Sequence, residues 1–185
     1  MKTNLHRNSL LVLIVVGVIV AFVFTLYLTP SDSFNRAKVY FEPVGNFSMQ
    51  VPSSFNIQRE KVTEDEIILK VSAPNDIAYA NPGLINVVIY KGAENKGLLE
   101  QAAAFLSVDP KYLIPFNYET PAYSYISQNG QELSYYYFFE NGGNIIVYKF
   151  NKSYFDKNNP LILIDNSLYA NTVLRSLNSI NFTSI

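Results

Sequence analysis

The chain of 185 residues contains no cysteine and no tryptophan, and its single histidine, His6, lies close to the N-terminus. Without cysteine the chain can form neither a disulfide framework nor a thiolate metal site. After residue 6 it also lacks histidine, the side chain that most often serves as a general base near neutral pH. We therefore expect no metal and no other cofactor, and we predict that the protein is not an enzyme.

Charge is sparse and balanced, with 14 Lys and Arg residues against 15 Asp and Glu residues. Such a balance provides no basic footprint for nucleic acid, so we expect no nucleic-acid partner. The acidic run Glu64-Asp65-Glu66 is interpreted as a solvated turn, because adjacent side chains of a strand cannot converge on one site. Glu132 and Glu140 flank an aromatic stretch and leave a paired-carboxylate hydrolase site open as an alternative.

One long stretch has no charge at all, and it runs from Ser9 to Thr29. A helix rises about 1.5 Å per residue, so roughly 20 apolar residues span the ~30 Å hydrocarbon core of a bilayer. The sequence therefore predicts a transmembrane helix over residues 9–29 that contacts the lipid bilayer. Representative apolar positions of this predicted anchor are Leu10, Val16, Val20, Phe24 and Leu28.

A cleaved signal peptide is the main alternative to this anchor. Its apolar region would be about 7–15 residues long and would precede a cleavage site of small residues. The run is longer than that and no A-x-A pattern follows it, so an uncleaved anchor is favoured. Basic residues are nearly equal on the two sides, but long domains translocate largely regardless of charge. We expect a single-pass protein of the cell membrane with its N-terminus in the cytoplasm and its C-terminal domain outside.

The rest of the chain is predicted to form one domain. We expect a short cytoplasmic tail over 1–8, the transmembrane helix over 9–29, a stalk over 30–38 and an extracytoplasmic domain over 39–185. Alternation of apolar and polar residues predicts strands over 39–42, 47–51, 55–60, 67–73, 84–91, 122–127, 131–139 and 144–151.

Helical periodicity predicts one helix over 94–108 and another that begins near Asp165. In the second helix, Ala170, Val173, Leu174 and Leu177 are expected to form the buried face. Strands joined by short turns pair antiparallel, and one-sided helices must cover a sheet. The predicted fold class is α+β, with an antiparallel β-sheet flanked by helices and preceded by one N-terminal transmembrane helix.

Two stretches of this domain resemble the PsbP/Mog1-like family. Residues 46–55, NFSMQVPSSF, are similar to the family's opening hairpin, and residues 173–182, VLRSLNSINF, to its closing helix. The resemblance implies an antiparallel sheet flanked by helices. The family includes photosystem II accessory proteins, a nuclear-transport factor and membrane-anchored bacterial proteins. Histidine sites of its photosynthetic members have no counterpart, because His6 precedes the predicted anchor.

The string Tyr135-Tyr136-Tyr137-Phe138-Phe139 is the most unusual in the domain. Side chains alternate across a sheet, so Tyr136 and Phe138 would share the face opposite to Tyr135, Tyr137 and Phe139. Either helices cover one face and the other is partly exposed or also covered, or the face of Tyr136 and Phe138 contacts a protein partner or a glycan.

The function predicted from the sequence is that of a non-catalytic, membrane-anchored accessory protein. Tyr136 and Phe138 are its candidate binding residues, and another envelope or membrane protein is the expected partner. The alternatives left open are a glycan-binding envelope module and a small carboxylate-dependent envelope hydrolase.

Overall fold

The computed structural model describes residues 36–74, 83–91, 97–156 and 159–183. The first five strands in these ranges are β1 (Ala37–Glu42), β2 (Phe47–Pro52), β3 (Asn56–Lys61), β4 (Glu66–Ser72) and β5 (Ile85–Tyr90). The later strands are β6 (Ile114–Pro115), β7 (Ala122–Asn129), β8 (Glu132–Asn141), β9 (Asn144–Phe155), β10 (Leu163–Asp165) and β11 (Asn181–Phe182). The helices are α2 (Leu98–Leu106) and α3 (Ala170–Asn178), with the 3-10 turns η2 (Pro110–Tyr112) and η3 (Ser167–Tyr169).

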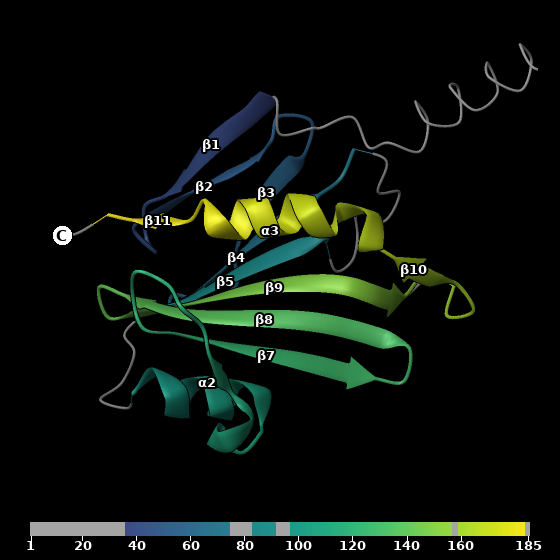
Figure 1. Cartoon of the computed structure of the whole chain (residues 1–185). Coiled ribbons are helices and arrows are strands. Elements are labelled where there is room, and N and C mark those ends of the chain that lie inside the picture. The colour runs from purple at the N-terminus through teal and green to yellow at the C-terminus, as the bar shows by residue number, and fades with distance from the viewer. Residues whose placement is uncertain (1–35, 75–82, 92–96, 157–158, 184–185) are drawn as a thin grey trace, which may run out of the picture.

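These strands form two antiparallel sheets (Figure 1). The larger sheet has the order β3-β4-β5-β9-β8-β7-β6, and β10 pairs with the end of β9. The smaller sheet has the order β1-β2-β11. The turn between β8 and β9 contains Gly142 and Gly143, both at positive φ, which glycine adopts without steric cost.

The larger sheet is covered on both faces (Figure 1). On one face α3 and the small sheet bury the main core, which includes Phe47, Leu69, Tyr148 and Leu177. On the other face α2 packs over β8 and β7 and buries a second, smaller cluster. Alternation of side chains along each strand supplies both clusters from the same strands.

The predicted fold class, an antiparallel sheet flanked by helices, is wrong because the helices are minor elements. The described part of the chain is mostly antiparallel β-sheet, and its two α-helices have only nine residues each. The helix predicted to run to residue 108 ends at Leu106, because Ser107 adopts the left-handed conformation. The predicted helix at Asp165 begins only at Ala170, because Leu163–Asp165 pairs with β9 as a strand.

The predicted buried face of α3 is also wrong at one position. Val173, Ser176 and Leu177 point into the core, whereas the side chain of Leu174 is 47% exposed. Successive residues of a helix are about 100° apart, so only a narrow stripe of this short helix meets the sheet. Leu174 lies beside that stripe.

The predicted anchor over 9–29, with Leu10, Val16, Val20, Phe24 and Leu28, lies outside the described residues. Within the ranges that the structure describes, no helix is long and apolar enough to cross a membrane. The first described strand, β1, starts at Ala37, two residues before the strand predicted from the sequence.

Candidate functional site

The aromatic string of β8 alternates between the two core clusters. Tyr135, Tyr137 and Phe139 face α3 and the small sheet, whereas Tyr136 and Phe138 face α2. The predicted alternation is therefore correct. What the sequence left open was whether the second face is covered.

Helix α2 covers this second face at Phe138, whose side chain is 0% exposed. Phe105 of α2 packs edge-on against the Phe138 ring, with 5.7 Å between ring centroids. Phe138 therefore cannot contact a partner at the surface, and its prediction as a binding residue is corrected. Tyr136 is half-buried, with its ring 6.3 Å from that of Phe138 and the Lys149 ammonium 5.3 Å from its centroid.

An open hollow of about 610 Å³ lies next to this covered face. Its walls come from the end of α2, from η2 and β6, and from the second half of β7. The lining residues are Ser107, Val108, Asp109, Tyr112, Ile114, Tyr125 and Ile126. We call this hollow the β7 groove. Tyr112, Ile114 and Ile126 are among the most exposed large apolar side chains of the domain, and Ile126 is 54% exposed.

The charged groups at the β7 groove neutralise one another. The Asp109 carboxylate accepts a hydrogen bond from the Lys111 backbone N–H at 3.0 Å and forms an ion pair with its ammonium at 2.9 Å. These hydrogen bonds hold the pKa of Asp109 below its usual value. The Lys111 ammonium also lies 5.1 Å from the centroid of the Tyr112 ring. The groove therefore suits an uncharged, apolar occupant.

The backbone of β7 is only partly paired on the side of this groove. Strand β6 has two residues and pairs with Ser124 and Tyr123 alone. The Phe116 N–H donates to the Ala122 carbonyl at 2.9 Å, so the backbone groups of Ala122 point away from β8. Because these directions alternate along an antiparallel strand, the N–H and C=O groups of Ile126 and Gln128 point the same way. Among the described strands, only β8 pairs with β7 at Ile126 and Gln128, and no described strand pairs with them on the side of the groove.

The two edges of the large sheet differ in chemistry. Strand β3, at the far edge, carries Arg59, Glu60 and Lys61, and charged side chains are a common device that prevents pairing with another chain. Strand β7, AYSYISQN, carries no charged residue. Of these two edges of the described large sheet, the β7 edge therefore retains the features of a strand that can accept a further strand.

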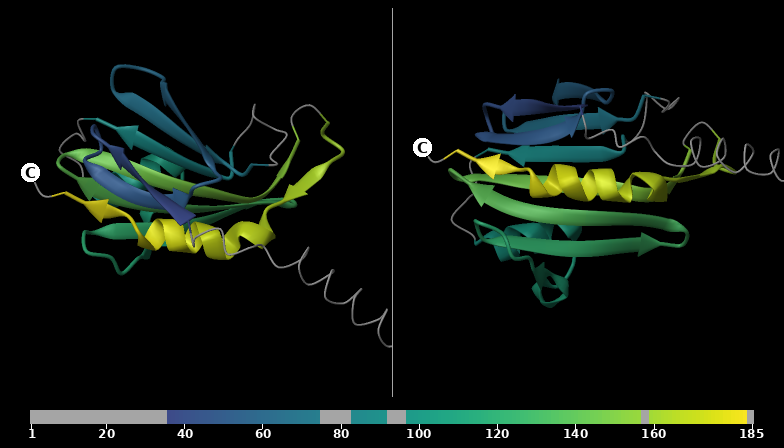
Figure 2. Two further views of the ribbon diagram at one scale, coloured as in Figure 1. Left: turned by 90° about the horizontal axis from the view of Figure 1, so that it is seen from above. Right: turned by 45° about the horizontal axis from the view of Figure 1, so that its top comes forward.

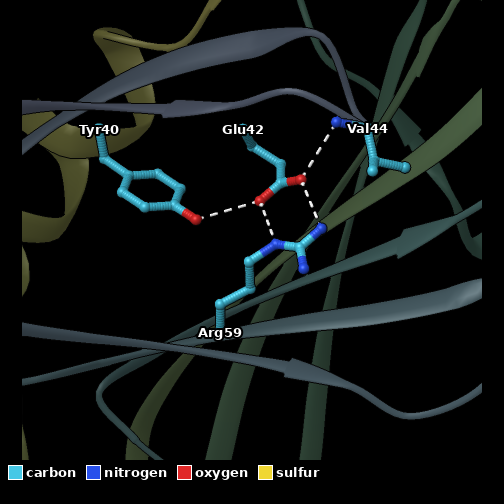
Figure 3. Close-up of polar contacts among 4 residues, drawn as sticks. All are labelled: Tyr40, Glu42, Val44 and Arg59. Carbon is cyan, nitrogen blue, oxygen red and sulfur yellow. Dashed lines mark hydrogen bonds and ion pairs between the residues drawn. The ribbon is translucent and has the colours of Figure 1, made fainter.

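A buried carboxylate forms a separate polar cluster between the two sheets (Figure 3). Glu42 of β1 is 0% exposed and accepts hydrogen bonds from Arg59 of β3 at 3.0 and 3.2 Å. It also accepts from the Tyr40 hydroxyl and the Val44 N–H, each at 3.1 Å. Both carboxylate oxygens are thus engaged, and the pair ties the small sheet to the large one. These hydrogen bonds explain why the Glu42 carboxylate can be buried, and they give Glu42 a structural role.

The cluster changes the acidity of its phenol. Burial, together with the adjacent Glu42 carboxylate and its hydrogen bond, raises the pKa of Tyr40 to about 12. Burial and Glu66 likewise raise the pKa of Tyr90 to about 12. Burial also raises the pKa values of Tyr118, Tyr137 and Tyr148.

These pKa values predict a loss of stability at alkaline pH. A phenol of the unfolded chain ionises near pH 10. The folded state therefore binds more protons between pH ~10 and ~12, and its stability is complete below this window and falls as pH rises through it. Titration followed by tyrosinate absorbance should show two stages in the folded protein and one stage in denaturant. Tyr40→Phe should reduce the late stage, and a single native stage near pH 10 would contradict the prediction.

The carboxylates considered for hydrolysis do not form a pair. Glu132 and Glu140 lie eight residues apart on β8, and at ~3.3 Å per residue they are separated by about 26 Å, far more than a glycosidase pair requires. Glu132 instead accepts a hydrogen bond from the Phe155 N–H at 2.9 Å. Glu64 and Asp65 lie in the bend before β4, as predicted. Within the described ranges, no three His, Cys, Asp or Glu side chains are grouped so that they could hold a metal ion.

Comparison with known proteins gives only distant structural likenesses. No family model and no curated protein matches the chain. A crystal structure from Bacteroides thetaiotaomicron VPI-5482 matches 80% of this chain at 12% identity and a TM-score of 0.46, and the chain spans 49% of that protein. The solution structure of a cyanobacterial PsbP (CyanoP) from Synechocystis sp. PCC 6803 matches 80% of this chain and 93% of its own, at 8% identity and a TM-score of 0.49.

A cyanobacterial PsbP structure is thus among the similar ones. Membership of the family has no support from a family model. Likenesses of this strength say nothing about function, so the residues of the chain itself must indicate it.

Proposed function

We propose that this chain is a non-catalytic binding protein, held at a membrane by residues 9–29, whose domain lies outside the cytoplasm and binds another protein at the β7 groove. The observation that carries the proposal is an uncharged, half-uncovered strand edge that opens onto an apolar groove. The uncharged run of the N-terminal sequence supports the membrane attachment.

The expected ligand is an extended segment of the partner that adds a strand beside β7. Strand addition supplies affinity through main-chain hydrogen bonds and specificity through pockets for alternate side chains. The N–H and C=O groups of Ile126 and Gln128 provide the main-chain partners, and Tyr112 and Ile114 provide apolar contacts. Because Asp109 is already paired with Lys111, the segment should be rich in β-branched and aromatic residues and poor in charge.

A library of random peptides displayed on phage, selected against the full chain in lipid nanodiscs, tests this proposal. We expect Ile126→Lys to weaken the selected peptides about tenfold or more, because it removes an apolar contact and places a charge at the strand edge. The matched control is Val62→Lys, since the Val62 side chain is similarly exposed, at 50%, and lies in the turn between β3 and β4.

Amide hydrogen exchange provides the second measurement. Exchange at the N–H groups of Ile126 and Gln128 should slow when a peptide binds, because these amides point to the open edge. Equal loss of binding in the Lys variants at Ile126 and Val62, or unchanged exchange at both amides, would refute strand addition at β7.

A further inference from the structure

A small cavity lies between α3 and the large sheet. Figure 2 shows α3 running along β9, and the two elements are in contact. The cavity has a volume of about 180 Å³ and shares no lining residue with the β7 groove. We call it the α3 cavity. Its lining residues are Tyr135 and Tyr137 of β8, Phe150 and Lys152 of β9, and Ala170, Val173 and Leu174 of α3.

The α3 cavity has an aromatic wall on the sheet and an aliphatic wall on the helix. On the sheet, the rings of Tyr135 and Phe150 are stacked, with 6.0 Å between their centroids. The Tyr137 ring packs edge-on against that of Tyr148, at 6.3 Å. On the helix, the half-exposed Leu174 borders the opening. An apolar cavity of about 150 Å³ holds one benzene ring, so the α3 cavity suits a ligand with a single ring. Aromatic walls favour an aromatic ring over an aliphatic one.

A β-bulge brings a lysine into this lining. The pairing of β9 with β8 skips Lys152, which is the extra residue between Asn151 and Ser153. The backbone of the bulge is fixed, because the Lys152 carbonyl accepts a hydrogen bond from the Asn166 N–H at 2.7 Å. Bulges often lie beside functional sites, where they redirect a side chain. Of the described lining residues, Lys152 alone carries a charge.

The polar groups of the lining are donors that await an acceptor. In the part of the chain that the structure describes, the Lys152 ammonium and the hydroxyls of Tyr135 and Tyr137 have no hydrogen-bond partner. Burial, together with the neighbouring Tyr135, raises the pKa of Tyr137, so this phenol keeps its proton at neutral pH.

The acidic side chain whose charge interacts with Lys152 is already held elsewhere. The Asp165 carboxylate accepts hydrogen bonds from the N–H and the hydroxyl of Ser167 at 2.9 and 2.6 Å. These bonds, more than the charge of Lys152, hold the pKa of Asp165 below its usual value. Within the described ranges, no ion pair joins Asp165 to Lys152. The positive charge of Lys152 is therefore left for a ligand.

We infer that the α3 cavity binds a small aromatic carboxylate. The ring lies between the aromatic wall of the sheet and Leu174, and the carboxylate accepts hydrogen bonds from the Lys152 ammonium and from a tyrosine hydroxyl. Hydrogen bonds between ionised partners are about twice as strong as neutral ones, so the charge selects an anion. A neutral ligand would cover the ammonium without giving it a partner, which is costly. The inference depends neither on the membrane attachment nor on the β7 groove.

Fluorine NMR of 4-fluorophenylacetate, added to the full chain in lipid nanodiscs, tests this inference. Empty nanodiscs measure the uptake of the ligand by lipid. We expect saturable binding that Lys152→Met weakens about tenfold or more, because the substitution removes the charged donor and keeps an apolar stem. The matched control is Lys149→Met, which removes the same charge from the same strand. The Lys149 ammonium lies over the ring of Tyr136 on the opposite face of the sheet, so its loss should change the affinity by less than about twofold.

Two further measurements separate a carboxylate site from an apolar void. The neutral 4-fluorophenylacetamide should bind the unchanged chain much more weakly than the acid does. Ala170→Leu fills part of the cavity and should weaken the binding of the acid, with circular dichroism showing that the variant is folded. If Ala170→Leu does not fold, the comparison of the two lysine variants still decides.

Three results would overturn the inference. They are no saturable binding at millimolar 4-fluorophenylacetate, equal affinities for the acid and the amide, and equal weakening by Lys152→Met and Lys149→Met. Peptides selected at the β7 groove should bind Lys152→Met as they bind the unchanged chain, so failure at one site is distinguishable from failure at the other.

Discussion

Phe138→Ala is expected to lower the free energy of unfolding by about 3–5 kcal/mol. The Phe138 ring is fully buried between β8 and α2 and packs against Phe105 and Tyr136. Its removal leaves a cavity and takes away one of the aromatic contacts of α2 with the sheet, so the loss exceeds the transfer energy of the ring alone. Denaturant unfolding of the full chain in detergent, followed by the near-ultraviolet circular dichroism of tyrosine, measures this loss.

Tyr136→Ala is the matched control on the same face of the same strand. Tyr136 is only half-buried, so its truncation should cost clearly less than that of Phe138. Tyr136→Ala could cost little stability and yet weaken peptide binding more than Ile126→Lys does. The partner would then contact the α2 side of the sheet, and the proposed binding site at the β7 groove would be wrong. A cost below about 0.5 kcal/mol for Phe138→Ala would mean that α2 does not cover β8 in solution.

Local patterns in the sequence predict the long strands well. Alternation in β2, with Phe47, Met49 and Val51 buried, and in β8 follows directly from the period of two in a strand. Elements of two or three residues, such as β6 and β10, have no pattern of their own. They exist because a neighbouring strand supplies backbone partners, which depends on tertiary structure.

The candidate site could be predicted only in part. The alternation of Tyr136 and Phe138 away from Tyr135 is readable from the sequence, but their covering is not, because α2 reaches them from 30 residues earlier. The β7 groove is formed by η2, the end of α2 and the open half of β7. No sequence motif predicts such an arrangement. An uncharged strand beside two short turns is the nearest signal, and it becomes informative only once β7 is known to lie at an edge.

The exposed position of Leu174 has a similar cause. Periodicity shows that residues at i, i+3, i+4 and i+7 share one side of a helix, but it does not give the width of the surface against which the helix packs. Helix α3 meets the sheets along a narrow line through Val173, Ser176 and Leu177. The inter-sheet pair of Glu42 and Arg59 is equally hidden, because no local pattern brings residues 17 apart onto facing sheets.

Leu177→Ala and Leu174→Ala should therefore have very different effects, although they are the same change three residues apart on one helix. Leu177 is 1% exposed in the core between the two sheets, and its truncation should cost about 2–5 kcal/mol through lost burial and a residual cavity. Leu174 already contacts water along nearly half of its surface. Its truncation should cost less than about 1 kcal/mol, because fewer buried methyl groups are removed and solvent fills the space.

The two substitutions control for each other, because both alter helix propensity in the same way and in the same helix. Any difference between their free energies of unfolding must come from packing, and the difference measures how far α3 is buried. Equal losses in the range of 2–5 kcal/mol would mean that α3 is rotated so that both leucines face the core. Equal and small losses would mean that α3 does not seal the core, and the small sheet with its Glu42–Arg59 pair would then have to hold that face alone.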